Sequence, residues 1–224
     1  MDMFPISLNL KGRLTLLVGA GRVGRRKLAK ILLAGARIRL VEPNPSPDIT
    51  RLAESGRLEM SAHYTPKLLE GLPLVFLATS DPAFNRKVAE EARGRGCWVN
   101  VADDPEASDF ILPAVVERGD FQIAVTTGGA SPALAASAAA RLSEMFGPEY
   151  GPLTRLMAAL RPMIMSSGLP TNTRGSLFKC VVASEPLRNH LARGETEAAK
   201  AVVSQLLAPL QMDGCFSLTG DVLE

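Results

Sequence analysis

Short apolar runs alternate with segments of helical character along the first half of the chain. Each run is five residues long and has the composition of a strand that is buried on both faces of a sheet. We expect helices between the runs, one of them a short helix over residues 65–72, together with a further short strand over residues 57–64. The runs are LTLLV (14–18), RIRLV (37–41), LVFLA (74–78) and CWVNV (97–101). Strands that alternate with helices predict an α/β unit around a parallel sheet of the Rossmann type.

The pattern changes near Pro113. Two apolar stretches, 110–116 and 121–125, are separated only by ERGD, which predicts a hairpin. A long alanine-rich helix follows, and from Gly147 onward helical patterns are interrupted by proline and glycine. We therefore divide the chain into a Rossmann domain (1–113), a small α+β segment (114–147) and a helical domain (148–224).

A glycine motif follows the first apolar run. Gly19, Gly21 and Gly24 have G-x-G-x-x-G spacing at the start of a predicted helix. In a dinucleotide site the first glycine permits a tight turn, the second lets the backbone approach a pyrophosphate, and the third lets the helix lie close to the sheet. Arg22 and Val23 would then place their free N–H groups toward the phosphates. This strand, turn and helix predict a dinucleotide-binding site.

Glu42 ends the second apolar run, about 20 residues after the glycines, where a carboxylate binds a ribose hydroxyl. Pro43 and Asn44 would lie beside the same ribose. A 2′-phosphate would meet a like charge at Glu42, which favours NAD over NADP. The alternative is that a basic residue of the following helix binds a 2′-phosphate, although a solvated helix face explains these residues as well; they are Arg22, Arg25, Arg26 and Lys27.

Polar residues follow the later strands, at the sheet edge where ligands of parallel sheets bind. Thr79 and Ser80 follow the third run and are candidates for cofactor contact, or alternatively for capping the next helix. Asn100, Asp103 and Asp104 emerge from the fourth run on the same side as the glycine turn. Asp103 could instead cap the turn that follows it, and two adjacent carboxylates allow the pKa of one to be raised.

A second polar loop precedes the alanine-rich helix. Thr126 and Thr127 offer hydroxyl groups, and Gly128 and Gly129 permit a close backbone approach. Ser131 is placed to cap the helix. The loop suits an anion-binding helix start and a well-capped turn equally.

Composition narrows the class of protein. The chain has 224 residues, of which 46% are hydrophobic, 21% charged and 5% aromatic, with a net charge of +2. These values favour a globular protein without nucleic-acid partners. We expect no membrane span and no signal peptide. Three scattered cysteines suggest reduced thiols in the cytoplasm, and we expect no metal site. His63 and His190 are interpreted as ordinary surface or packing residues.

Four segments occur together in an order that resembles the precorrin-2 dehydrogenases, including the dehydrogenase–chelatase portion of siroheme synthases. They are GAGRVGRRKLAKILLAGARIRLV, FLATSDPAFN, VNVADDPEASDFILPAVV and IAVTTGGASPALA. The likeness covers most of residues 1–145, whereas the helical tail carries no sharp motif. Glu42 departs from the family pattern and strengthens the expectation of NAD.

The resemblance implies NAD-dependent oxidation of precorrin-2 to sirohydrochlorin, on the route to sirohaem. It also implies a homodimer formed through segment 114–147, with catalysis by the aspartate of the NVxD pattern, here Asp103. Substrate would be contacted by residues that follow the fourth and last apolar runs: Asn100, Asp104, Thr126, Thr127, Gly128 and Gly129. Some relatives also insert iron or cobalt, which nothing in these residues requires. A non-enzymatic NAD sensor, or a regulatory ligand-binding module, is the alternative from a different class.

Overall fold

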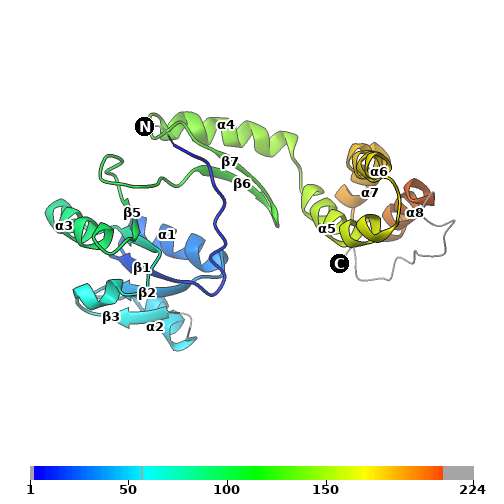
Figure 1. Ribbon diagram of the computed structural model, residues 1–224. Coiled ribbons are helices and arrows are strands. Elements are labelled where there is room, and N and C mark those ends of the chain that lie inside the picture. Colours follow the sequence, from blue (N-terminus) through cyan, green and yellow to red (C-terminus); the bar gives the residue numbers. More distant parts are fainter. Residues whose placement is uncertain (1–2, 57, 209–224) are drawn as a thin grey trace. The chain divides into compact units, whose positions relative to one another are not determined.

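The computed structural model describes residues 3–56 and 58–208 (Figure 1). The chain forms two compact units, Met1–Leu112 and Pro113–Glu224, and each is described by itself. Cys215 and the end of the last predicted helical stretch lie outside the described residues. Among the residues that are described, no helix is both long enough and apolar enough to cross a membrane.

The first unit contains a parallel sheet of five strands in the order β3-β2-β1-β4-β5. The central strand β1 pairs on one side with β2 and on the other with β4, so that Val18 lies opposite both Val41 and Leu77. This arrangement confirms the predicted Rossmann-type α/β fold. The strands are β1 (Leu14–Val18), β2 (Arg37–Val41), β3 (Leu58–Ser61), β4 (Leu74–Leu77) and β5 (Trp98–Val101).

Helices cover both faces of this sheet because the strands are apolar on both faces. Helices α1 (Arg22–Leu33) and α2 (Pro47–Glu54) contribute Leu28 and Ile49 to the core on one face. Helix α3 (Pro82–Arg93) contributes Val88 to the core on the other face. The strand order changes direction between β1 and β4. Ligands of such sheets bind outside the carboxyl ends of the strands at this point.

Two predicted elements differ from the observed ones. The expected helix at 65–72 is a single 3-10 turn, η1 (Pro66–Leu69), and the expected strand at 57–64 is limited to β3. Gly71, with a positive φ of 71°, turns the chain soon after η1 and leaves little room for a longer helix.

The second unit begins with the predicted hairpin, formed by the antiparallel strands β6 (Ala114–Arg118) and β7 (Phe121–Val125). Helix α4 (Pro132–Met145) packs against both strands. Ser131 caps it, since its hydroxyl accepts the N–H of Leu134 at 3.2 Å. Phe121, Phe146 and Tyr150 form a cluster of rings that joins the hairpin to the next helix.

Within residues 113–208, which the structure describes, four helices complete the second unit around an apolar core of their own. Leu156, Leu160, Ile164, Val181 and Leu187 are fully buried in it. The helices are α5 (Tyr150–Ser166), α6 (Thr171–Ala183), α7 (Glu185–Ala192) and α8 (Thr196–Leu206). The hairpin, α4 and these helices fall within one compact unit, so a separate role for segment 114–147 stays a prediction.

Candidate functional site: a cavity at the carboxyl edge of the parallel sheet

The three glycines of the motif meet three different surroundings. Gly19 has a φ of 90°, and a Cβ atom there would lie 2.6 Å from the carbonyl oxygen of Ala78. At Gly24 a Cβ would lie 2.1 Å from the carbonyl oxygen of Gly19. At Gly21 it would meet nothing within 4 Å, and no side chain caps the helix that begins there. Gly19 and Gly24 therefore hold the turn against the sheet, while Gly21 leaves space for a ligand at the positive end of α1.

Glu42 is fixed beside this turn by backbone donors. Its Oε2 accepts the N–H of Ala20 at 2.7 Å, and its Oε1 accepts the N–H of Asn44 at 3.1 Å. The carboxylate thus joins the glycine turn to the end of β2, and its remaining lone pairs are free to accept ribose hydroxyls.

A cavity of about 720 Å³ lies at this edge of the sheet. It is lined by the glycine turn, the end of β2, the end of β4 and the loop after β5, all from the first unit. Of the residues expected to bind cofactor or to act in catalysis, it contains Gly19, Gly21, Arg22, Val23, Glu42, Pro43, Thr79, Ser80 and Asp103. Gly24 packs beneath the turn, and Asn44 donates to Glu42 without lining the cavity.

Part of the cavity wall was missed by sequence reasoning. Ala62, His63 and Tyr64 follow β3 and line the cavity, together with Phe84 of α3. Tyr64 donates to Glu91 at 2.7 Å and packs edge-on against Phe84, and its burial, followed by the bond to Glu91, raises the pKa of its hydroxyl. The only available signal was position, because the ends of parallel strands share one edge.

Thr79 lies between the cavity and α3, and its contact with a cofactor stays a prediction. Thr79 lines the cavity, and its hydroxyl donates to the buried Asn85 at 2.6 Å. The cap of α3 is Asp81, whose carboxylate accepts the N–H groups of Ala83 and Phe84 at 3.0 Å each. Ser80, which also lines the cavity, is therefore not needed as a cap.

Asp103 lines the cavity in a left-handed backbone conformation. Its φ of 62° is the only positive value for a non-glycine among the described residues. Aspartate tolerates this region better than most residues, but the conformation still has an energetic cost and is commonly found at functional sites. The fold thus turns Asp103 toward the cavity that holds the glycine turn.

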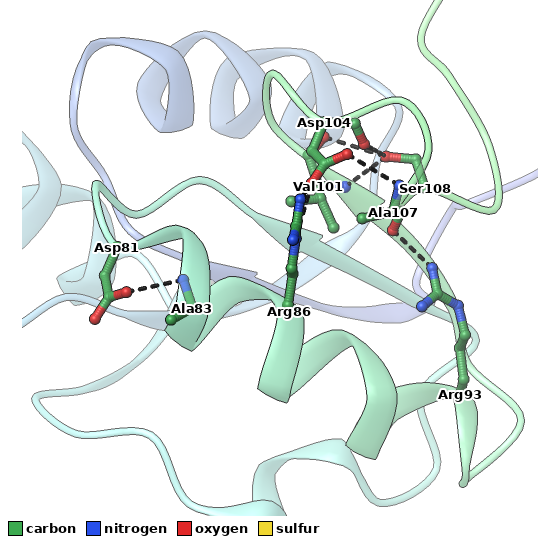
Figure 2. Close-up of polar contacts among 8 residues, drawn as sticks. All are labelled: Asp81, Ala83, Arg86, Arg93, Val101, Asp104, Ala107 and Ser108. Carbon is green, nitrogen blue, oxygen red and sulfur yellow. Dashed lines mark hydrogen bonds and ion pairs between the residues drawn. The ribbon is translucent and has the colours of Figure 1, made fainter.

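Asp104, its neighbour, is held by other groups (Figure 2). Its carboxylate accepts the N–H of Ala107 at 3.1 Å and pairs with Arg86 of α3 at 3.1 Å. The Ala107 bond first, and then Arg86, lower the pKa of Asp104. The raised pKa that two adjacent carboxylates allow therefore does not occur at Asp104, and it is Asp104, not Asp103, that caps the following turn.

Asn100 is buried behind the cavity. Its Nδ2 donates to the carbonyl oxygen of Phe110 at 2.8 Å, and its Oδ1 accepts from Lys27 at 2.6 Å. Neither Asn100 nor Asp104 is among the residues that line the cavity. Contact of either with a substrate stays a prediction.

The TTGG loop lies in the second unit and is closed by its own hydrogen bonds. Thr127 donates to the carbonyl oxygen of Ser131 at 3.1 Å and accepts its N–H at 2.9 Å, and Thr126 accepts the N–H of Gly128 at 3.2 Å. Gly128 and Gly129 have φ values of 63° and 88°. The hydroxyls are thus engaged as in a capped turn, and a substrate role stays a prediction.

The residues present fit a dinucleotide. An uncapped helix start, open space above Gly21 and a carboxylate at the end of β2 supply the three features that bind pyrophosphate and ribose.

Comparisons with known proteins agree with this geometry. Residues 6–114 match the family model "Putative NAD(P)-binding". A siroheme synthase of Chromobacterium violaceum is 38% identical over 209 residues, 93% of this chain and 44% of the relative. Siroheme synthase 1 of Aeromonas salmonicida is 32% identical over 93% of this chain and 45% of its own length. The chain thus spans less than half the length of these relatives.

The solved structure of SirC, a precorrin-2 dehydrogenase, matches with a TM-score of 0.74 and 25% identity. The match covers 92% of this chain and all of that chain. Together with the glycine turn, Glu42 and the cavity that they border, these matches assign the chain to the family of precorrin-2 dehydrogenases and siroheme synthases.

Proposed function

We propose that the chain oxidises precorrin-2 to sirohydrochlorin with NAD as hydride acceptor. The observation that carries the proposal is that one cavity is lined both by the dinucleotide turn, with Gly21 and Glu42, and by Asp103. The full-length match to SirC supports it further.

The reaction removes a hydride and a proton from the partly reduced ring of precorrin-2, and the products are sirohydrochlorin, NADH and a proton. Bound NAD supplies the hydride acceptor. The proposed role of this chain is to hold NAD through the glycine turn and Glu42 and to accept the proton at a carboxylate oxygen of Asp103. Thr79 and Ser80 line the same cavity and are proposed to contact the cofactor.

NAD is the proposed cofactor in preference to NADP. The Glu42 carboxylate is held by the N–H groups of Ala20 and Asn44 and cannot readily turn away from a bound ribose. A 2′-phosphate would meet its charge at close range.

Anaerobic incubation with precorrin-2 and NAD tests the proposal. We expect NADH absorbance to rise together with the spectrum of sirohydrochlorin. Binding of NAD without either signal would contradict the proposal and favour an NAD sensor. Adding ferrous or cobaltous ions after oxidation tests whether the chain also inserts a metal, which nothing in its residues requires.

Asp103→Asn separates catalysis from folding. Asparagine is almost the same size as aspartate and tolerates the same positive φ, so we expect the variant to fold and bind NAD normally. Its turnover should fall by about 10²- to 10⁴-fold, the usual contribution of a general base. Unchanged turnover would exclude Asp103 as the proton acceptor.

A homodimer is also proposed. Helix α4 exposes 61% of Leu134 and 70% of Met145, which is unusual for large apolar side chains and suits a surface that meets a second copy. Sedimentation of the purified chain should give twice the monomer mass, and Leu134→Lys should reduce it to the monomer mass.

We propose the cytoplasm as the compartment of this protein, since Cys97 and Cys180 are free thiols.

A further inference from the structure

Lys27 lies on α1 but does not belong to a solvated helix face. Its side chain is half-buried, and its Nζ donates to Oδ1 of Asn100 at 2.6 Å. The contact joins the helix that follows the glycine turn to β5, 73 residues further along the chain. A lysine that gives up part of its hydration for one short hydrogen bond needs a compensating electrostatic interaction.

Asn100 is oriented for this contact by its second hydrogen bond. The side chain is 5% exposed, and its Nδ2 donates to the carbonyl oxygen of Phe110 at 2.8 Å. Because the amide nitrogen is committed to Phe110, the amide oxygen points to Lys27. Phe110 is itself fixed by an edge-on contact with Phe76 of β4, with ring centroids 5.4 Å apart. The acceptor that Lys27 meets is therefore rigid.

Asp103 completes the group of residues. It follows Asn100 by three positions, immediately after β5, and it lines the cavity. Burial lowers the pKa of Lys27, as do the nearby charges of Arg26 and Lys30, whereas the charge of Asp103 raises it. Asp103 is thus the nearby negative charge that favours the ammonium form of Lys27. Neither Lys27 nor Asn100 is among the residues that line the cavity.

We propose that Lys27 is a positioning residue for the reaction, which holds the Asp103 carboxylate toward the cavity through its bond to Asn100 and through its positive charge. This inference rests on the proposed oxidation of precorrin-2 and assigns Lys27 a role in it. Lys27 has no contact with the substrate in this scheme. Its positive charge attracts the carboxylate of Asp103, which must face a ligand from a strained backbone position.

Three substitutions separate the charge from the hydrogen bond. Lys27→Arg keeps both charge and donors, Lys27→Gln keeps a donor without charge, and Lys27→Met keeps neither. We expect kcat for precorrin-2 oxidation to fall at least tenfold in the Gln and Met variants, and to stay within about threefold of wild type in the Arg variant. The dissociation constant for NAD and the melting temperature should change little. Lys87→Met, at an exposed position on α3, is the matched control and should behave as wild type.

A second measurement needs neither substrate nor cofactor. NMR titration of protein with ¹³C-labelled lysine Cε follows Lys27, whose signal is assigned by its loss in Lys27→Arg. In wild type, Lys27 should titrate at lower pH than exposed lysines, because burial lowers its pKa. In Asp103→Asn it should titrate lower still, since the carboxylate that raises its pKa is gone.

The outcomes distinguish this inference from the proposed function. If wild type forms neither NADH nor sirohydrochlorin, the proposed function fails and this inference fails with it. If wild type is active and Lys27→Gln retains full kcat, only the role of Lys27 is overturned. An unchanged Lys27 titration in Asp103→Asn would overturn the electrostatic part irrespective of activity.

Discussion

Single atoms decide the properties of the glycine turn. Gly19 and Gly21 are two positions apart, yet a methyl group would strike the backbone of Ala78 at the first and meet open space at the second. Stability and ligand binding can therefore be tested separately at these neighbouring residues.

Gly21→Ala should fold normally and bind NAD poorly. The φ of −63° at Gly21 suits alanine, but its Cβ would fill the space that the pyrophosphate needs. We expect an unchanged melting temperature and at least a tenfold rise in the NAD dissociation constant by calorimetry. Gly19→Ala is the counterpart and should lower the free energy of unfolding by about 2–4 kcal/mol, because positive φ and a backbone clash combine. Equal stability of the two variants would contradict this division.

Glu42→Gln should weaken NAD binding and reduce the preference for NAD over NADP. The glutamine amide has one acceptor oxygen in place of two, so it accepts fewer hydrogen bonds from the ribose hydroxyls. It also lacks the negative charge that repels a 2′-phosphate. A tenfold rise in the NAD dissociation constant corresponds to about 1.4 kcal/mol. Fluorescence titration with both cofactors measures the change. Glu54→Gln, at the exposed end of α2, is the control, and identical behaviour of the two variants would exclude Glu42 from the site.

At the scale of elements, an ion pair connects α3 to the loop after β5. Arg86 pairs with Asp104, and Arg93, about two turns further along the same helix, donates to the carbonyl oxygen of Ala107 at 2.6 Å (Figure 2). The hydroxyl of Ser108 donates to the Asp104 carbonyl at 2.8 Å and closes the same loop. These contacts fix the short segment that carries Asp103.

The contribution of Asp104 to stability should depend on pH. Its pKa is lowered by the Ala107 N–H and by Arg86, so the folded state favours the ionised form. The stabilisation is present above the unfolded pKa of about 3.9 and is lost as the pH falls through the lower folded value. Denaturant unfolding should find wild type more stable than Asp104→Ala at pH 7, with the difference shrinking below about pH 4. A difference independent of pH would mean that the charge of Asp104 contributes nothing.

The sheet elements were predictable to a greater degree than the residues of the site. Each buried strand is a contiguous apolar run, and the glycines mark the first turn whatever surrounds them. The role of Lys27 could not be predicted in this way. In the sequence Lys27 is one of several basic residues on a helix, and only the folded chain brings its side chain to Asn100 of β5. His63 lines the cavity for the same reason, since it follows a strand that ends at the shared edge.

At the scale of the whole molecule, two units have separate cores. Leu17 is buried among the residues of α1 and β2, and Leu156 is buried among the helices of the second unit. Among the residues that the structure describes, those that line the cavity belong to the first unit. Cofactor binding and the folding of the second unit can therefore be examined separately.

Leu156→Ala should destabilise the second unit and leave NAD binding intact. Leu156 is fully buried, so its truncation should cost about 2–5 kcal/mol. Calorimetric unfolding should show a lowered transition for that unit, while the NAD dissociation constant changes less than twofold. Leu17→Ala is the matched substitution in the first unit and should weaken both stability and NAD binding. Loss of NAD affinity in Leu156→Ala would show that the two units are energetically coupled.

The amino-acid sequence by itself determined the alternation of strands and helices, the glycine turn and the acidic end of β2, because each depends on residues that are neighbours in the chain. Tertiary structure alone decided which of two adjacent aspartates faces the cavity. Asp104 pairs with Arg86 and accepts the N–H of Ala107. Asp103 has a left-handed backbone conformation and lines the same cavity as the glycine turn. The ion pair of Asp104 with Arg86, and the cavity that Asp103 lines, both depend on segments distant in the sequence that meet at one edge of a parallel sheet.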